Sequence, residues 1–239
     1  MAVLFISDIH LSPERPEIFR AFSNFLSEHA KNASALYVLG DLFDAWIGDD
    51  DPSELAINTK KALREISDAG VDLFIQRGNR DFTIGHKFSK EIRGTIIKDE
   101  HIVTQGHLSA LVMHGDSLCT DDVEYQRFRR KSRNPVYRWF LINLPLKIRL
   151  GIAKKWRNDS ASATSNKTVE IMDVNEDAVS SVMKKHEITT LIHGHTHRPQ
   201  IHKVSEGRRI VLGDWESKGW FATLSDQGFS LESFPILHQ

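Results

Sequence analysis

Short apolar runs that end in polar residues constrain the fold of this chain most strongly. The runs are Val3 to Ile6, Ala35 to Leu39, Val71 to Ile75, Leu108 to Met113 and Thr189 to Ile192. Such near-continuous apolar stretches are typical of buried strands in a parallel sheet. Helical periodicity separates the first three runs, over Glu17 to Ala30 and Glu54 to Ala69. This alternation predicts an α/β fold with parallel pairing and right-handed crossovers.

The chain departs from this alternation in its second half. Short strands over Arg209 to Leu212, Phe221 to Leu224 and Phe229 to Phe234 predict an antiparallel tail. The Ser/Ala/Asn-rich passage from Asn158 to Asn166 predicts a loop. Residues 127–157 contain eleven Lys or Arg and no acidic residue, interleaved with aromatic and aliphatic residues. This segment predicts two amphipathic helices, interrupted near its prolines.

Composition excludes several classes of protein. A length of 239 residues and a formal net charge of -1 fit one globular domain with an insertion, and argue against a generally basic nucleic-acid-binding coat. The single cysteine, Cys119, excludes an internal disulfide and favours the reducing cytoplasm. No apolar stretch approaches the length of about 18 residues that a membrane-spanning helix needs, so any membrane contact is expected to be peripheral.

Each of the five runs ends in residue types that bind metals. The endings are Asp8-Ile-His10, Gly40-Asp41, Gly78-Asn79-Arg80-Asp81, His114-Gly115-Asp116 and Gly194-His195-Thr196-His197. Open α/β sheets bind ligands outside the carboxyl ends of their strands, so we expect the five endings to line one crevice. One such Asp or His alone would usually be a helix cap or a structural residue. Imidazole, carboxylate and amide ligands without a thiolate favour Mn²⁺ over structural zinc.

In this order, the motifs D-x-H, G-D, G-N-R-D, H-G and G-H-x-H resemble those of the calcineurin-like metallophosphoesterases. Longer stretches narrow the resemblance to the branch of that family that hydrolyses the pyrophosphate bond of UDP-2,3-diacylglucosamine in lipid A biosynthesis. These stretches are Gly40 to Asp51, Gly78 to Phe82, His114 to Asp122 and Ile171 to Asn175. The resemblance implies a four-layer α/β/β/α sandwich core, residues 1–122 and 168–239, with a helical cap over residues 123–167.

The resemblance also implies two Mn²⁺ ions per chain. Asp8, His10 and His197 would bind one ion. Asn79, His114 and His195 would bind the other, with Asp41 bridging both. Arg80 and His195 would act at the reacting phosphate, and Asp81 would orient Arg80 or a metal ligand. The expected substrate contacts are Asn79, Arg80, Asp122, Ser160, Thr164, Lys167 and His195, with Thr164 standing where members of this branch carry Asn.

The implied reaction is attack of water on the α-phosphorus, giving UMP and 2,3-diacylglucosamine 1-phosphate. A different di-metal phosphoesterase acting on a nucleotide or a phosphodiester is the alternative activity, and a membrane-binding protein without catalysis is a third possibility. The protein is expected in the cytoplasm of a Gram-negative bacterium, peripheral on the inner face of the inner membrane.

The basic and apolar cap has two candidate partners. Anionic lipids would relieve the repulsion between its cations. A nucleic-acid strand is the competing partner, but the family resemblance favours lipid and no nucleic acid is expected. We expect Phe128, Trp139 and Phe140 to contact acyl chains, and Arg129, Arg130, Lys131 and Arg133 to face lipid headgroups.

Overall fold

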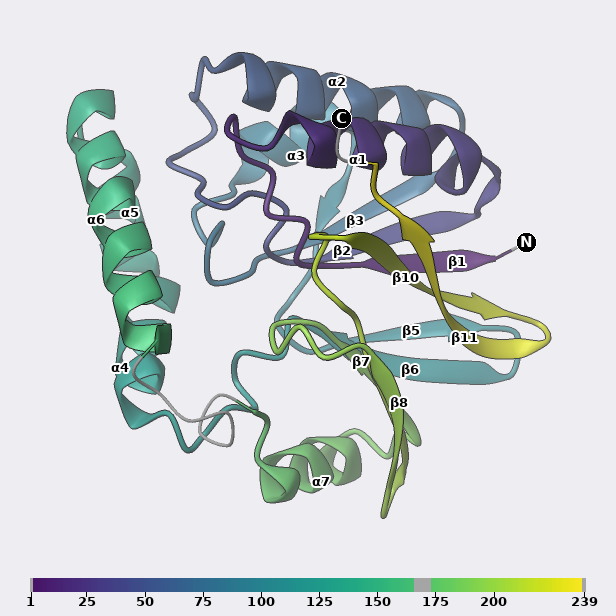
Figure 1. Ribbon diagram of the computed structural model, residues 1–239. Helices are drawn as coiled ribbons and strands as arrows, with labels where there is room; N and C mark the ends of the chain where they lie inside the picture. Colours follow the sequence, from purple (N-terminus) through teal and green to yellow (C-terminus); the bar gives the residue numbers. More distant parts are fainter. Residues whose placement is uncertain (1, 166–172, 238–239) are drawn as a thin grey trace.

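Two β-sheets pack face to face at the centre of the molecule (Figure 1). The computed structural model describes residues 2–165 and 173–237, and over residues 157–165 it describes the backbone alone. The first sheet has the order β11-β10-β1-β2-β3-β4 and the second has the order β5-β6-β7-β9-β8. The first contains β1 (Val3–Ile6), β2 (Ala35–Leu39), β3 (Asp72–Gln76), β4 (Thr95–Ile96), β10 (Lys218–Ser225) and β11 (Gly228–Pro235). The second contains β5 (His101–Gln105), β6 (Leu108–Met113), β7 (Thr190–His193), β8 (Gln200–Val204) and β9 (Gly207–Val211).

Helices cover the outer face of each sheet (Figure 1). The first sheet is covered by α1 (Pro16–Glu28), α2 (Glu54–Asp68) and α3 (His86–Ile92), and the second by α7 (Glu176–Lys185). A short 3₁₀ helix, η1 (Ala30–Asn32), follows α1. Strand alternation builds the layers, because in β1 Leu4 and Ile6 pack with the helices while Val3 and Phe5 pack between the sheets. The expected α/β/β/α sandwich is confirmed.

Strand pairing confirms the parallel core. Strand β2 pairs in parallel with both β1 and β3, and β7 pairs in parallel with both β6 and β9. The carboxyl ends of these strands therefore deliver their loops to neighbouring positions at one edge of the sandwich.

The prediction of a wholly antiparallel tail is wrong for one strand. β10 does pair antiparallel with β1 and with β11. β9 instead pairs in parallel with β7, because β8 forms the outer arm of a hairpin with β9 and the chain returns beside β7. Sequence analysis did not identify β8, whose residues are mostly exposed and lack an apolar run.

Three helices form the cap, rather than the two predicted: α4 (Val123–Arg133), α5 (Pro135–Ile142) and α6 (Leu146–Ser165). Pro135 begins a helix instead of only interrupting one, because the Asn134 side chain accepts hydrogen bonds from the backbone of the first turn. The loop predicted from Asn158 is wrong as far as Ser165, since no Gly or Pro there stops α6 and each added residue gains a backbone bond.

The cap stands beside the edge of the sandwich where β1 and β2 end (Figure 1). The division into a core of residues 1–122 and 168–239 and a cap of residues 123–167 stays a prediction, because its second boundary lies outside the described residues. Within the described ranges, no helix is long and apolar enough to span a bilayer.

Candidate metal centre and substrate cavity

The loops after five strands bring the predicted metal ligands together. Asp8 and His10 follow β1, Asp41 follows β2, Asn79 follows β3, His114 follows β6, and His195 and His197 follow β7. Each of these side chains has a nitrogen or oxygen atom within 3.7 Å of a nitrogen or oxygen atom of another member of the set. The convergence expected from the sequence therefore holds for all seven positions.

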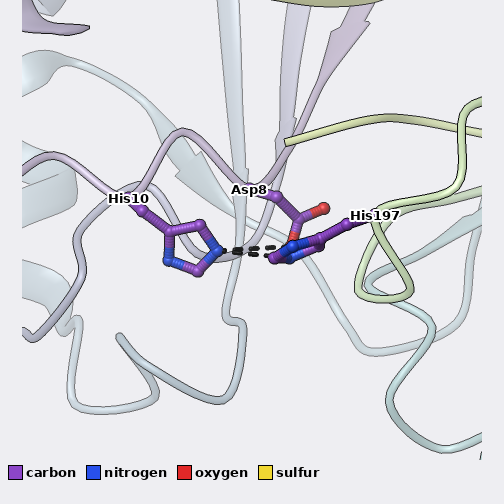
Figure 2. A group of neighbouring side chains, drawn as sticks. All are labelled: Asp8, His10 and His197. Atoms are coloured by element: carbon purple, nitrogen blue, oxygen red, sulfur yellow. Dashed lines mark hydrogen bonds and ion pairs between the residues drawn. The ribbon is translucent and has the colours of Figure 1, made fainter. Parts of the chain in front are cut away.

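Asp8, His10 and His197 form the first group, and their side chains point toward one another (Figure 2). The two Nε2 atoms of the histidines lie 3.3 Å apart. Asp8 Oδ1 lies 3.4 Å from Nε2 of His197 and 3.9 Å from Nε2 of His10. Asp8 is fully buried, and among the described residues Oδ1 has no hydrogen-bond partner. A buried, unpartnered carboxylate oxygen facing two imidazole nitrogens fits a divalent cation.

Asn79, His114 and His195 form the second group. Oδ1 of Asn79 lies 2.9 Å from Nε2 of His114 and 3.0 Å from Nδ1 of His195. Nδ1 of His114 lies 2.9 Å from the carbonyl oxygen of Leu39, which can only accept. Nδ1 therefore donates this bond and directs Nε2 toward the site. One amide oxygen and two imidazole nitrogens are thus gathered at a second point.

Asp41 lies between the two groups. Its Oδ2 is 3.9 Å from Nε2 of His10, and its Oδ1 is 3.7 Å from Nε2 of His114. The backbone N–H of Arg80 donates a 2.8 Å hydrogen bond to Oδ1 and fixes the carboxylate. One oxygen of Asp41 therefore faces each group, as a bridging ligand requires.

Burial and mutual charge set the protonation of the site. Burial lowers the pKa of His10 to about 3 and, together with neighbouring positive charge, that of His195 to about 4. Burial raises the pKa of Asp41 to about 7. Burial alone would lower the pKa of His197, but the Asp8 carboxylate beside it raises the pKa to about 9. Burial therefore keeps His10 and His195 neutral at neutral pH, as metal ligands must be. Nearby carboxylates raise the pKa of His114, as they do that of His197, against the effect of burial.

The backbone at the site is strained. Positive φ angles occur at Asp8 (54°), His10 (50°), Asp41 (53°), His195 (69°) and His197 (55°). Only two other non-glycine residues in the described chain share this conformation, so the strain is concentrated where ligands are expected. Glycine is required beside it, because a Cβ at Gly78 would lie 2.0 Å from Oδ1 of Asp41 and one at Gly194 would lie 2.0 Å from Oδ2 of Asp8.

Asp81 acts on the loops rather than on the Arg80 side chain. Its buried carboxylate accepts hydrogen bonds from the backbone N–H groups of Leu42 (2.8 Å) and Gly78 (2.7 Å). These bonds join the loop that contains Asp41 to the loop that contains Asn79. Asp81 thereby positions two candidate ligands through the backbone.

A cavity of about 670 Å³ extends from the metal-type residues to the cap. Its polar end includes His10, Asp41, Asn79, Arg80, His195 and His197, with Asp122 farther along. Its apolar wall includes Trp46, Phe82, Phe128, Leu141, Ile152 and Trp156. Ser160 and Thr164 lie in the part of α6 described by its backbone alone, and Lys167 lies outside the described residues. Their substrate contacts therefore stay predictions.

Comparison with known proteins decides the family. The model of the calcineurin-like phosphoesterase family matches residues 1–199. This chain belongs to the calcineurin-like phosphoesterases. Proteins named UDP-2,3-diacylglucosamine hydrolase from Azotobacter vinelandii and Pseudomonas fluorescens resemble this phosphoesterase at 47% and 48% identity, over 99% and 98% of this chain and 100% and 96% of their own. The expected resemblance to that branch is confirmed.

Solved structures support the fold of this phosphoesterase. An archaeal phosphodiesterase matches with a TM-score of 0.50 at 14% identity, covering 98% of this chain and 100% of its own. A hypothetical protein from Pyrococcus horikoshii matches with a TM-score of 0.50 at 11% identity, covering 100% of this chain and 88% of its own. At such identities the likeness concerns the architecture alone.

Two residues of the phosphoesterase cavity escaped sequence analysis. Tyr125 on α4 places its ring centroid 5.5 Å from that of His195 and donates a 2.9 Å hydrogen bond to Asp116. Buried Arg149 on α6 donates to the carbonyl oxygen of Ile47 and forms a two-pronged ion pair with Asp50. The helical phase of α4 relative to Asp122 could have indicated Tyr125. Nothing in the sequence distinguishes Arg149 from the other ten Lys and Arg of residues 127–157.

The assumption that the cap cations lack counter-charges is wrong. Arg129 pairs with Asp116 (2.9 Å) and Asp99 (2.7 Å), and Arg133 lies 3.4 Å from Asp116. Asp99 and Asp116 belong to the core and lie outside residues 127–157, so the composition of that segment does not include them. Arg129 and Arg133 are mostly buried and paired with core acids, so they are not the uncompensated cations that the segment alone indicated.

The three aromatic residues expected to contact acyl chains occupy different surfaces. Phe128 lines the cavity, where its ring packs edge-on against Trp156. Trp139 and Phe140 are 64% and 59% exposed and do not line the cavity. The expectation of acyl contact is therefore wrong for these two, because they occupy the outer face of α5.

Proposed function

We propose that this protein hydrolyses the pyrophosphate bond of UDP-2,3-diacylglucosamine, giving UMP and 2,3-diacylglucosamine 1-phosphate. One observation favours this substrate most: a single cavity joins a cluster of metal-type ligands to a deep apolar wall. The polar end suits a diphosphate and the wall suits acyl chains. Relatives of nearly the same length that bear the name of this activity support the assignment.

We propose two Mn²⁺ ions as the cofactor. Asp8, His10 and His197 would hold one ion, Asn79, His114 and His195 the other, and Asp41 both. The donors are carboxylate, amide and imidazole groups without a thiolate, a set that suits Mn²⁺. When bound, such ions act as Lewis acids at the phosphoryl oxygens and lower the pKa of an attacking water.

The chain's own residues then position the phosphates. Arg80 lines the cavity beside the ligands, where its planar fork can brace phosphate oxygens as charge shifts toward the leaving group. His195 and Asn79 serve both as ligands and as phosphate contacts. The leaving group is itself a phosphate with a second pKa of about 6, so little help from a general acid is needed.

The substrate's glucosamine and acyl chains would occupy the cap end of the cavity. Asp122, Ser160, Thr164 and Lys167 are proposed to contact the sugar or its phosphate. Acyl chains would lie against the apolar wall, where each buried methylene contributes about 0.8 kcal/mol. A substrate lacking acyl chains would forgo that contribution.

The outer face of the cap is proposed to rest on the anionic inner face of the bacterial inner membrane. Val136, Trp139 and Phe140 on α5 are exposed, and so are the cations Lys147 and Lys154 on α6. Apolar residues beside basic ones are typical of peripheral membrane contact. We therefore propose a cytoplasmic protein, peripheral at that membrane, without a nucleic-acid partner.

Release of UMP tests the proposal directly. Enzyme stripped with a chelator should lose activity on UDP-2,3-diacylglucosamine and regain it when Mn²⁺ is returned. A UDP-sugar without acyl chains is the matched control, and it should be hydrolysed far more slowly. Activity that survives stripping would contradict the metal-dependent mechanism, whereas equal rates on both substrates would favour a general nucleotide pyrophosphatase.

A further inference from the structure

Three arginines, from the end of β3 and from the cap helices α4 and α5, lie close together. Arg77 follows β3, Arg133 ends α4 and Arg138 lies in α5. Arg77 Nε and Arg138 Nη2 both donate to the carbonyl oxygen of Ile84, at 2.7 and 3.4 Å. Arg133 Nη2 donates to the carbonyl oxygen of Arg77 at 2.9 Å. Because they share acceptors and backbone, the three guanidinium groups must lie close together.

Two donors of this arginine cluster are left over. Arg133 Nη1 and Arg138 Nε are buried and have no hydrogen-bond partner among the described residues. Buried donors in native proteins are nearly always paired, with protein, water or a bound ion. Burial and the charge of Arg133 also lower the pKa of Arg138, while Asp49 and Asp99 act in the opposite direction. An anion with several acceptor oxygens would satisfy both donors and relieve the repulsion.

The neighbourhood of the cluster indicates which anion fits. In α5, Arg138 lies at the border between the buried side of the helix, marked by Leu141, and the exposed side that bears Val136, Trp139 and Phe140. An anion bound here would therefore sit next to an exposed apolar surface. A phosphate headgroup attached to acyl chains matches this combination, since planar guanidinium forks suit phosphate oxygens and the apolar face suits the chains.

We propose that Arg77, Arg133 and Arg138 form a binding site for the phosphate headgroup of an anionic membrane lipid. The lipid would hold α5 against the bilayer. The inference rests on the membrane contact proposed above and is independent of the hydrolytic reaction. It differs from general attraction between a basic surface and a membrane, because it requires these three guanidinium groups and the two unpaired donors among them.

Vesicle binding by the full chain tests the site. Binding to vesicles of phosphatidylglycerol with phosphatidylcholine would be compared for wild type, Arg138→Gln, Arg138→Lys and Arg130→Gln. Arg130 is an exposed cation of α4 outside the cluster, so its variant removes the same charge and is the matched control. Loss of one diffuse surface charge should weaken binding about fivefold. Loss of a charge-assisted bidentate contact should weaken it at least about tenfold.

The lysine variant separates charge from geometry. Arg138→Lys keeps the charge but loses the fork, so its binding should stay clearly weaker than that of wild type. Equal losses for Arg138→Gln and Arg130→Gln, with Arg138→Lys like wild type, would overturn the site and leave only diffuse attraction. Turnover of a small soluble phosphodiester by Arg138→Gln should equal that of wild type and reports that the variant is folded. Arg138→Lys serves if the glutamine variant does not fold.

A second arm distinguishes lipid from free phosphate. If inorganic phosphate alone raises the melting temperature of wild type but not of Arg138→Gln, while vesicle binding is the same for both, the site takes a soluble anion and the lipid proposal is wrong. If wild type does not bind these vesicles at all, the proposal also fails. Release of UMP from detergent-dispersed substrate would still test the hydrolytic function separately.

Discussion

Two phenylalanines of the cap offer a matched test of the substrate cavity. Phe128 lines the cavity, with its ring centroid 6.2 Å from that of Phe82 and 5.8 Å from that of Trp156. Phe140 is 59% exposed on the outer face of α5. Replacing each with alanine removes the same atoms from the same cap. Only the first replacement should change how acyl chains bind.

The expected size of the effect follows from the contact that is lost. If the Phe128 ring covers two or three methylenes of an acyl chain, truncation forfeits about 2 kcal/mol, or about 30-fold in kcat/KM. Phe128→Ala also removes part of an aromatic cluster, so a lower melting temperature is expected. Phe140→Ala should change the free energy of unfolding by about 0.5 kcal/mol or less, because the side chain is mostly in water.

The assay compares two substrates in detergent solution, where membrane binding plays no part. UMP release would be measured with the diacylated substrate, and a small phosphodiester that needs only the metal end would serve as the control. Phe128→Ala should slow the first and spare the second, while Phe140→Ala should spare both. If Phe128→Ala slows both equally, the ring supports the metal loops, and the acyl-chain assignment of the cavity is wrong.

The other predictions concern two candidate metal ligands, the phosphate contact Arg80, the buried Arg149 of the cap, and Cys119. Asp41→Ala should lower the content of both metal ions, whereas His10→Ala should lower the content of one. If metal analysis shows that His10→Ala loses both ions and Asp41→Ala loses neither, Asp41 does not bridge them. Arg80→Ala should lower kcat about 10²-fold with a smaller change in KM; a raised KM alone would make Arg80 a simple binding residue. Arg149→Gln should raise KM for the diacylated substrate but not for a small diester, since it releases α6 from Asp50 and Ile47. Burial raises the pKa of Cys119 to about 12. At pH 8 its thiolate should therefore be about 10³-fold less populated than that of an ordinary thiol, and its alkylation should be slower by the same factor. Rapid alkylation of the native protein would refute this.

The metal end of the site could be predicted because its signals are local. A strand that ends in Asp-x-His places both side chains beside one carboxyl edge, whatever lies elsewhere in the chain. Asp8 and His10 therefore lie where the pattern predicts. The apolar runs were equally informative, since β1 and β2 have the predicted bounds and β3 begins one residue later than predicted.

The cap could not be predicted because its contacts join residues far apart in the sequence. Arg129 meets Asp99 and Asp116, whereas nothing within residues 127–157 reveals an acidic partner. Apolar residues were also ambiguous, because α5 has apolar residues on both its buried and its exposed side and so has no single polar face. Trp139 and Phe128 have similar chemistry, and only the fold assigns Phe128 to the cavity and Trp139 to the exposed surface.

The anchors of the cap explain how one cavity can bind an acyl chain and place a phosphorus atom at the same time. Arg149 of α6 holds Ile47 and Asp50, in the loop that begins with Asp41. Arg129 of α4 holds Asp116, two residues after His114. The cap is therefore attached to the same loops that present the candidate metal ligands, rather than to a distant part of the core. Because the apolar wall and the candidate ligands share these supports, we expect binding energy gained by acyl chains at the wall to orient the phosphate at the ligands.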